Sequence, residues 1–183
     1  MDRIAMLQAL LASDPFRRDA LEVVATLGLP DGWIGAGFVR DAVWDDRHGF
    51  PRRRPVGDID VLWFDDVTAD RGVDAALQKE LSIRRPGIEW SVKNQARMHR
   101  RNGDVPYGCV ADAMRRWPET ATAVAARIGT DGQVEINAPL GVDDLFALRL
   151  RPTEAFIADK RQVFDDRIAS KRWLDRYPLL VVT

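Results

Sequence analysis

Apolar positions near the start of the chain recur at helical spacing in two stretches. Residues 3–11 have the pattern of a short amphipathic helix. A second helix is predicted over residues 14–27, because this stretch begins with Asp-Pro, a favoured N-cap and first-turn pair, and is followed by Gly and Pro. We expect these helices, within residues 1–29, to pack on a domain that spans residues 30–183.

After these helices, short strand-like apolar runs alternate with further helical patterns. The runs predicted as strands are 33–36, 59–64, 88–98, 134–136 and 146–150. The patterns predicted as helices are 38–43, 70–81, 110–128 with a break at Trp117-Pro118, and 154–175. Gly and Pro breakers predict a loop over residues 47–57. Strands separated by helices, some of them closely spaced, indicate a single α/β or α+β domain with a mixed sheet flanked by helices.

Length and composition limit the classes of protein to consider. With 183 residues, 46% of them hydrophobic, the chain has the size and the apolar content of one ordinary domain. Its single cysteine, Cys109, excludes an internal disulfide and fits a reducing compartment. No apolar run approaches the roughly 18 residues of a membrane span, and the first residues lack a signal-peptide pattern. We therefore expect a cytoplasmic protein with no membrane partner.

The charges are nearly balanced. Twenty-seven basic and 28 acidic side chains give a net charge of −1. Such a balance provides no overall attraction to nucleic acid or to anionic lipid. It favours a small-molecule or protein partner over long nucleic acid.

The segment with the clearest chemistry runs from residue 33 to residue 64. It places a turn containing Gly37 between a strand and a helix, and then a strand that carries Asp58 and Asp60. Alternate side chains of a strand point to the same side, so these two carboxylates share one face. Two such carboxylates can chelate a hard cation such as Mg²⁺ or Mn²⁺, and a glycine turn before a helix can bind a triphosphate. Each feature alone is common, but the combination indicates a nucleotidyl-transfer site.

The same residues resemble a known family signature. Gly35-Ala36-Gly37-Phe38-Val39-Arg40-Asp41, followed by Asp58-Ile59-Asp60-Val61, is similar to the signature of the DNA polymerase β-like nucleotidyltransferase superfamily. The nearest pattern is the Gly-Gly-x-Val-Arg-Asp … Asp-x-Asp of tRNA CCA-adding enzymes and bacterial poly(A) polymerases. Over roughly residues 30–178, including the stretches that begin at Trp90, Trp117 and Gly141, the chain also resembles a small bacterial group of nucleotidyltransferases with no assigned substrate.

The resemblance implies roles for the matching residues. It implies that Asp58 and Asp60 form the catalytic, metal-binding pair. It also implies that the nucleotide-binding turn and the start of its helix comprise Ala36, Gly37, Arg40 and Asp41. The chain departs from the pattern at Ala36, where a first Gly usually stands, and in the long interval between Gly37 and Asp58.

A third carboxylate of the superfamily has no clear match. Glu89 is the first candidate, because it alternates with Ser91 on a strand expected to lie beside the aspartate pair, and Asp144 is the second. Without a third acid there is no evident general base for an attacking hydroxyl. A catalytically silent module that binds nucleotide or a partner is therefore the alternative to an enzyme.

Two further polar groups have open interpretations. Asn94, Gln95 and Arg97 are candidates for contacts with a base or an acceptor, or they form an internal network that stabilises the sheet. The run Arg52-Arg53-Arg54 can clamp phosphates, or it is a solvated loop. Together with residues 99–101, this run also suggests a weaker RNA-binding hypothesis. The charged helix near the C-terminus has the pattern of an ordinary ion-paired surface.

The leading hypothesis is a metal-dependent nucleotidyltransferase. It would use Mg²⁺ or Mn²⁺ at Asp58 and Asp60 to transfer a nucleoside monophosphate from an NTP to the hydroxyl of an unidentified acceptor. The acceptor, the preferred base and the oligomeric state are not determined by the sequence.

Overall fold

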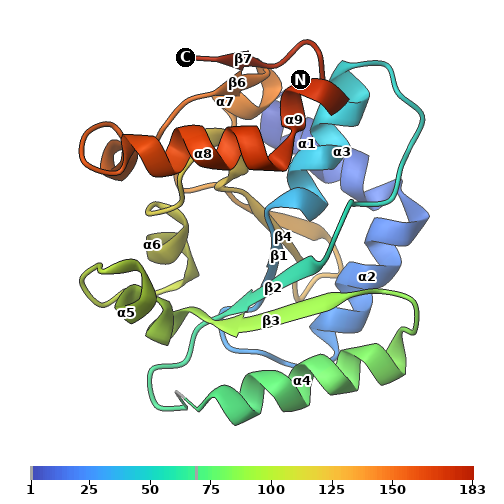
Figure 1. Ribbon diagram of the computed structural model, residues 1–183. Helices are drawn as coiled ribbons and strands as arrows, with labels where there is room; N and C mark the ends of the chain where they lie inside the picture. Colours follow the sequence, from blue (N-terminus) through green and yellow to red (C-terminus); the bar gives the residue numbers. More distant parts are fainter. Residues whose placement is uncertain (1, 69) are drawn as a thin grey trace.

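Five short strands form the central sheet of the protein, which we describe from a computed structural model for residues 2–68 and 70–183 (Figure 1). The strands are β1 (Trp33–Gly35), β2 (Ile59–Trp63), β3 (Trp90–Asn94), β4 (Ala125–Ile128) and β5 (Val134–Asn137). Their order across the sheet is β3-β2-β1-β4-β5. Strands β2 and β3 are parallel and the other neighbours are antiparallel, so the predicted mixed sheet is confirmed.

Helices surround this sheet. They are α1 (Arg3–Ala12), α2 (Pro15–Ala25), α3 (Gly37–Arg47), α4 (Arg71–Arg84), α5 (Met98–Asn102), α6 (Val110–Met114), α7 (Asp143–Phe146), α8 (Arg161–Lys171) and α9 (Trp173–Arg176). Short 3₁₀ turns occupy η1 (Gln95–Arg97), η2 (Thr120–Thr122) and η3 (Glu154–Phe156). A separate parallel pair consists of β6 (Arg149–Leu150) and β7 (Val181–Val182). None of the described helices combines the length and the apolar character needed to cross a membrane.

The two faces of the sheet are covered differently. Helices α1, α2 and α4 contribute to one large buried cluster that includes Ile34, Val61 and Val92 of the central strands. Within it, α1 contacts β5, α2 contacts β4 and α4 contacts β3. On the opposite face, Trp33 and Leu62 belong to a smaller cluster with residues of α6. Since side chains alternate along a strand, Asp58 and Asp60 lie on this second face with Leu62.

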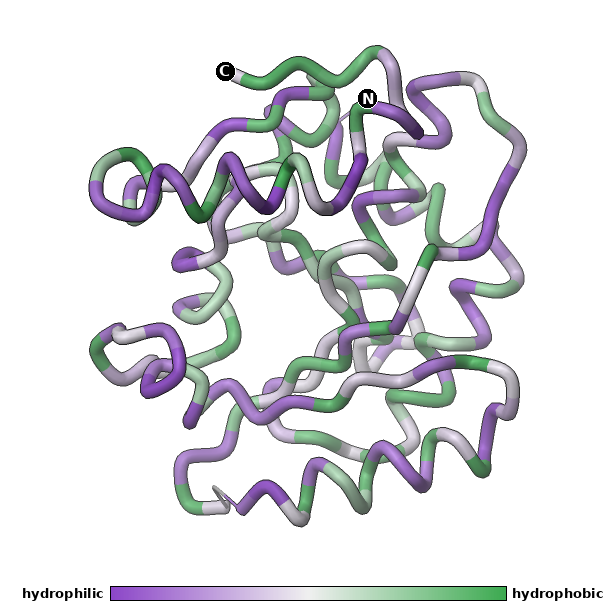
Figure 2. The backbone as a smooth tube through the Cα atoms, viewed as in Figure 1, coloured by the Kyte–Doolittle hydropathy of each residue, from purple (hydrophilic) through white to green (hydrophobic). Residues whose placement is uncertain are grey.

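Helix α4 also covers the outer edge of β3. The Oε1 atom of Gln78 accepts a hydrogen bond from the Val92 N–H at 3.3 Å, and Oδ1 of Asp74 accepts one from the Asn94 N–H at 3.0 Å. An uncovered edge strand would present such N–H groups for pairing with another chain. Figure 2 shows the hydropathy along the backbone, with hydrophilic segments on the outer helices and on the long connection between α3 and β2.

Four stretches differ from the sequence-based prediction. The single helix predicted over 154–175 is divided into η3, α8 and α9, because residues 157–160 are not helical and Arg172 (φ 50°) is left-handed. Residues 125–128, predicted as helix, form β4 because they complete the sheet between β1 and β5. The strand predicted to reach residue 98 ends at Asn94, whose Oδ1 caps η1 by accepting from the Ala96 N–H at 3.0 Å. Within 146–150, predicted as one strand, the backbone reverses at Leu148 (φ 57°), so only the last two residues are extended in β6.

Candidate functional site

The start of β2 carries the two candidate carboxylates. Asp58 directly precedes the strand and Asp60 is its second residue, while Ile59 between them is buried in the core. Burial, together with the charge of Asp58, raises the pKa of Asp60 to about 6. The two carboxylates therefore lie close enough to repel each other, and a cation between them would relieve this repulsion.

The glycine-containing turn lies next to this pair because β1 and β2 are antiparallel neighbours. Ile34 pairs with Val61, and one further step of the same register places Gly35 opposite Asp60. A Cβ atom at Gly35 would lie 2.7 Å from Cδ1 of Leu62 and 3.2 Å from the Trp117 ring. Gly35 is therefore required by close packing on the face that carries the aspartates.

Two residues, Ala36 and Gly37, shape the turn before α3. Ala36, at the position before α3, has φ 51° and ψ −122°, a conformation that an L-residue adopts only with strain. Gly37 begins the helix, and a Cβ atom there would lie 3.2 Å from Nη2 of Arg40. The backbone thus keeps the glycine-type turn although Ala replaces the first Gly, and the N–H groups of the first turn of α3 point to where an anion can bind.

Arg40 and Asp41 lie behind the turn rather than in an open cleft. Arg40 is 6% exposed and Asp41 2%. The Nε and Nη2 atoms of Arg40 donate to Oδ1 of Asp41 at 2.9 and 2.7 Å, and the guanidinium lies 4.8 and 4.6 Å from the ring centroids of Trp44 and Trp173. This geometry fixes Arg40 as an interior charge. It still acts on the candidate site, because its charge opposes the upward shift in the pKa of Asp60.

The backbone of Glu89 lies beside the aspartate pair in the sheet, but Glu89 does not complete a three-carboxylate cluster. Its carbonyl oxygen accepts from the Ile59 N–H at 2.7 Å, so β3 begins next to Asp58 as the sequence suggested. In the part of the chain that the structure describes, however, no group of three His, Cys, Asp or Glu side chains is arranged to hold a metal ion. The second candidate, Asp144, accepts from Thr120 at 2.6 Å and pairs with Arg151.

Asn94, Gln95 and Arg97 lie at the opposite end of β3. Asn94 is fully buried; its Nδ2 donates to the carbonyls of Asp65 and Thr68 at 2.7 and 2.9 Å, and Gln95 donates to the Lys93 carbonyl at 3.0 Å. These contacts favour the internal network for Asn94 and Gln95.

Arg97 differs from these two residues. It forms an ion pair with Asp74 and lines a cavity between α4 and β3. The structure therefore does not place this residue against the aspartate pair.

Helix α8 brings two cations that the sequence analysis missed. The charges of Lys171 and Arg167 both act to lower the pKa of Asp60, so this helix faces the aspartate pair. The expected ion-paired surface is present where Arg161 pairs with Asp165, but Arg167 instead pairs with the fully buried Glu119, Nε to Oε1, at 2.9 Å. A signal was present in the sequence, because no acidic residue stands three or four positions from Arg167.

The arrangement agrees with a family comparison. A family model described as nucleotidyltransferase matches residues 22–182. The chain belongs to this nucleotidyltransferase family. A search of curated protein sequences gave no match.

Solved structures share the fold of the chain. An NMR structure described as a CCA-adding enzyme head domain is 29% identical, with a TM-score of 0.83, and the match covers 98% of this chain and 95% of that chain. The Thermotoga maritima CCA-adding enzyme complexed with tRNA is 16% identical (TM-score 0.57), and a CCA-adding enzyme with CTP is 17% identical (TM-score 0.58). These matches cover 98% of this chain but 42% and 43% of those chains, so the nucleotidyltransferase spans less than half of their length.

Proposed function

We propose that this nucleotidyltransferase uses a divalent cation, Mg²⁺ or Mn²⁺, to transfer a nucleoside monophosphate from an NTP to an acceptor hydroxyl. The observation that carries the proposal is the placement of Asp58 and Asp60 beside the Gly35–Gly37 turn on one face of the sheet. This joins two hard oxygen ligands to a helix N-terminus, and the two parts suit the cation and the triphosphate, respectively.

The donor set of the carboxylate pair fits a divalent cation. Hard cations prefer carboxylate oxygens, and the raised pKa of Asp60 expresses a repulsion from Asp58 that such a cation would relieve. When bound, the cation would neutralise phosphate charge and favour the ionised form of the attacking hydroxyl.

Residues of the chain would bind and orient the triphosphate. The first-turn N–H groups of α3 would hold phosphate oxygens, and the small side chains at positions 36 and 37 would permit a close approach. Arg167 and Lys171 of α8 would attract the phosphates and neutralise the charge that develops on the leaving pyrophosphate. Arg40 would support the same site from the interior, through its charge rather than by contact.

A binding module without catalysis is the second candidate. It is favoured by one observation: the described residues contain no three-carboxylate cluster around Asp58 and Asp60. Under this alternative the nucleotide would bind at the same turn, but no group would accept the proton of an attacking hydroxyl.

The deciding experiment measures nucleotide transfer and NTP binding on the same protein samples. The full chain is incubated with Mg²⁺, each of the four NTPs and cell extract; pyrophosphate release is measured, and nucleotide-modified products are sought by mass spectrometry. We expect release that falls about 100-fold or more in Asp58→Asn/Asp60→Asn. The matched control is Asp46→Asn, which removes the charge of an exposed aspartate on α3 and should leave release unchanged.

NTP binding without pyrophosphate release from any NTP would establish the binding module in place of the enzyme. Equal release by the wild type and by the double variant would contradict the proposed role of the aspartates.

A further inference from the structure

A large cavity with an excess of positive charge lies between α4, β3 and α5, at the end of β3 away from Asp58. Its volume is about 1040 Å³, and six cationic side chains line it against two acidic ones, an excess of four positive charges in a chain whose net charge is −1. The cationic residues are Arg71, Lys79, Lys93, Arg97, Arg100 and Arg101. We call this cavity the basic pocket.

Most of these cations have no acidic partner among the described residues. Arg97 pairs with Asp74, but among the described residues the other five cations of the basic pocket form no ion pair. Elsewhere in the protein, by contrast, exposed arginines such as Arg84 and Arg161 pair with acids one helical turn away. Among the described residues some other cations, such as Arg47 and Arg116, also form no ion pair, but five such cations line this one cavity.

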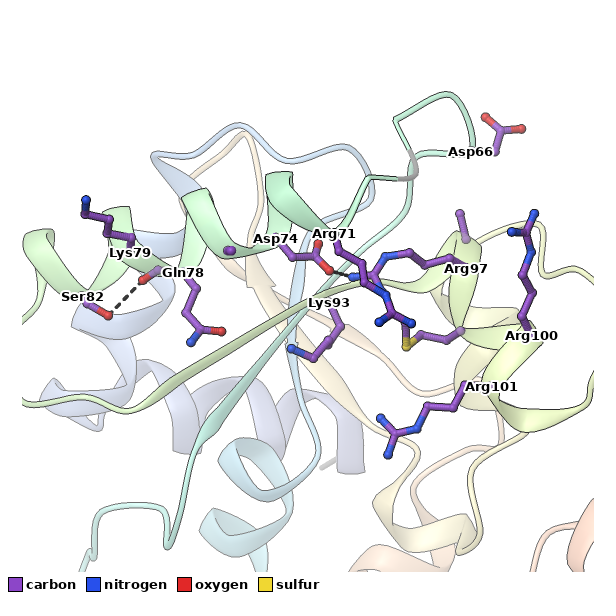
Figure 3. Close-up of a pocket in the computed structure, with 13 residues that line it drawn as sticks. Asp66, Arg71, Asp74, Gln78, Lys79, Ser82, Lys93, Arg97, Arg100 and Arg101 are labelled. Atoms are coloured by element: carbon purple, nitrogen blue, oxygen red, sulfur yellow. Dashed lines mark hydrogen bonds and ion pairs between the residues drawn. The ribbon is translucent and has the colours of Figure 1, made fainter.

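The geometry brings several of these cations together. In Figure 3, Arg71 of α4, Lys93 of β3, Arg97 of η1 and Arg101 of α5 reach into one space, while Asp66 lies at its rim. Burial, together with the neighbouring charge of Arg71, lowers the pKa of Arg97. The Nε atom of Arg97 is buried and has no hydrogen-bond partner in the described chain. Like charges held at close range with an unused donor are stabilised when an anion binds between them.

We propose that the basic pocket binds a small molecule that carries two or more phosphate groups. Guanidinium groups bind phosphate oxygens in pairs, and lysine ammonium groups add point charges. The three unpaired cations that converge in Figure 3, Arg71, Lys93 and Arg101, exceed what one phosphate group can neutralise, since a phosphate monoester carries about two negative charges at neutral pH. The N-terminus of the 14-residue helix α4, at Arg71, adds a favourable dipole on the same side.

The surroundings favour a compact ligand over a nucleic acid chain. A nucleic-acid surface requires a continuous basic track. The other arginine-rich stretch, residues 52–54, does not extend the pocket: Arg52 bonds to Ser13, Arg53 pairs with Asp45, and Arg54 lies 5.0 Å from the Phe16 ring centroid. Residues 52–54 thus do not extend the basic pocket into a continuous track.

The position of Lys93 links the basic pocket to the proposed transfer site. On paired parallel strands, Lys93 lies opposite Leu62, and Leu62 shares its face with Asp60. Strand rise and strand spacing therefore place the Cα atoms of Lys93 and Asp60 about 8 Å apart, so a ligand held by Lys93 would extend toward the aspartate pair. This link depends on the proposed function, whereas binding in the pocket does not.

Binding is tested by calorimetric titration of the full chain with inorganic tripolyphosphate in the presence of EDTA. We expect one site, unaffected by Asp58→Asn/Asp60→Asn, with affinity that is at least about tenfold weaker in Lys93→Gln/Arg101→Gln. The control is Arg115→Gln/Arg161→Gln, which removes two positive charges from exposed ion pairs and should retain the affinity. Thermal unfolding of each variant verifies that it is folded.

Three results would overturn the proposal. The first is equal affinity in the wild type and the pocket variant. The second is a requirement for Mg²⁺ and the aspartates, which would assign the binding to the nucleotide site. The third is tighter binding of single-stranded adenosine 20-mer RNA than of tripolyphosphate, with weakening in the control variant as well as in the pocket variant. Failure of NTP transfer alone would contradict the proposed function and leave this binding result intact.

Discussion

Arg167 on α8 reaches across to Glu119, whose carboxylate is fully buried, and the two form an ion pair with an Nε–Oε1 distance of 2.9 Å. Glu119 also accepts a hydrogen bond from the Thr122 hydroxyl at 2.8 Å. The guanidinium of Arg167 also lies 5.5 Å from the Trp173 ring centroid, and its charge acts to lower the pKa of Asp60. The pair therefore holds α8 over the face of the sheet that carries the aspartates.

Glu119→Gln should destabilise the fold by about 3 kcal/mol, because it removes one partner of a largely buried ion pair. Urea unfolding measures the change. Arg161→Gln serves as the control, since it breaks an exposed pair on the same helix and should cost less than about 0.5 kcal/mol. Equal losses in the two variants would show that Glu119 does not anchor α8.

Ala36→Gly should stabilise the protein by about 1 kcal/mol. Ala36 has φ 51°, which strains an L-residue, and glycine adopts this conformation without strain. Ala75→Gly, at an exposed position within α4, should instead destabilise by about 1 kcal/mol. Thermal or urea unfolding distinguishes the two signs, and destabilisation by Ala36→Gly would contradict the strained turn.

Gly35→Ala should destabilise the protein by about 2 kcal/mol, because its methyl group would overlap Cδ1 of Leu62. Leu62→Ala should relieve this overlap, so the double variant should be less destabilised than the sum of the single variants. Urea unfolding of all four proteins completes the cycle. Strict additivity would show that the two residues are not in close contact.

Asp60→Asn should stabilise the metal-free protein at pH 7.5 and have less effect at pH 5. The pKa of Asp60 is raised to about 6 in the folded state from an ordinary value of 3.8, so the folded protein holds this proton more tightly than the unfolded chain. The stability due to this group is present below pH 3.8 and is lost as the pH rises through about 6. The Asp60→Asn variant does not lose stability in this way, because asparagine carries no titrating proton. A difference that is the same at both pH values, measured in EDTA by urea unfolding, would show that burial does not raise this pKa.

The same variant tests the cation. At pH 7.5, Mg²⁺ should raise the unfolding temperature of the wild type and not that of Asp60→Asn, because only a protein that binds the ion in its folded state gains from it. For the wild type the gain should diminish below about pH 6, where a proton competes for Asp60. Asp46→Asn is the control, in which Mg²⁺ should raise the unfolding temperature as much as in the wild type.

Local sequence pattern accounts for a large part of the fold. The amphipathic repeats of α1 and α2, the turn at Gly37, and the alternation of Asp58 and Asp60 depend on neighbours within a few residues. For this reason these features could be predicted. The alternation of strand-like and helical segments likewise predicted the mixed sheet. The family signature in residues 35–41 and 58–61 is also local, and it led to the nucleotidyltransferase family.

Contacts between distant residues decided what the sequence pattern could not. Residues 125–128 are alanine-rich and favour a helix by themselves, but they form a strand because β1 and β5 both offer them backbone hydrogen bonds. Arg167 resembles a solvated surface charge until the fold buries Glu119 beneath it. The cations of the basic pocket come from four separate elements, α4, β3, η1 and α5. The sequence alone indicated Asp58 and Asp60 as candidates for metal binding and the Gly37 turn as a candidate for phosphate binding. The tertiary structure determined which charges lie together unneutralised, because electrostatic energy depends on distances in space and on burial rather than on separation along the chain.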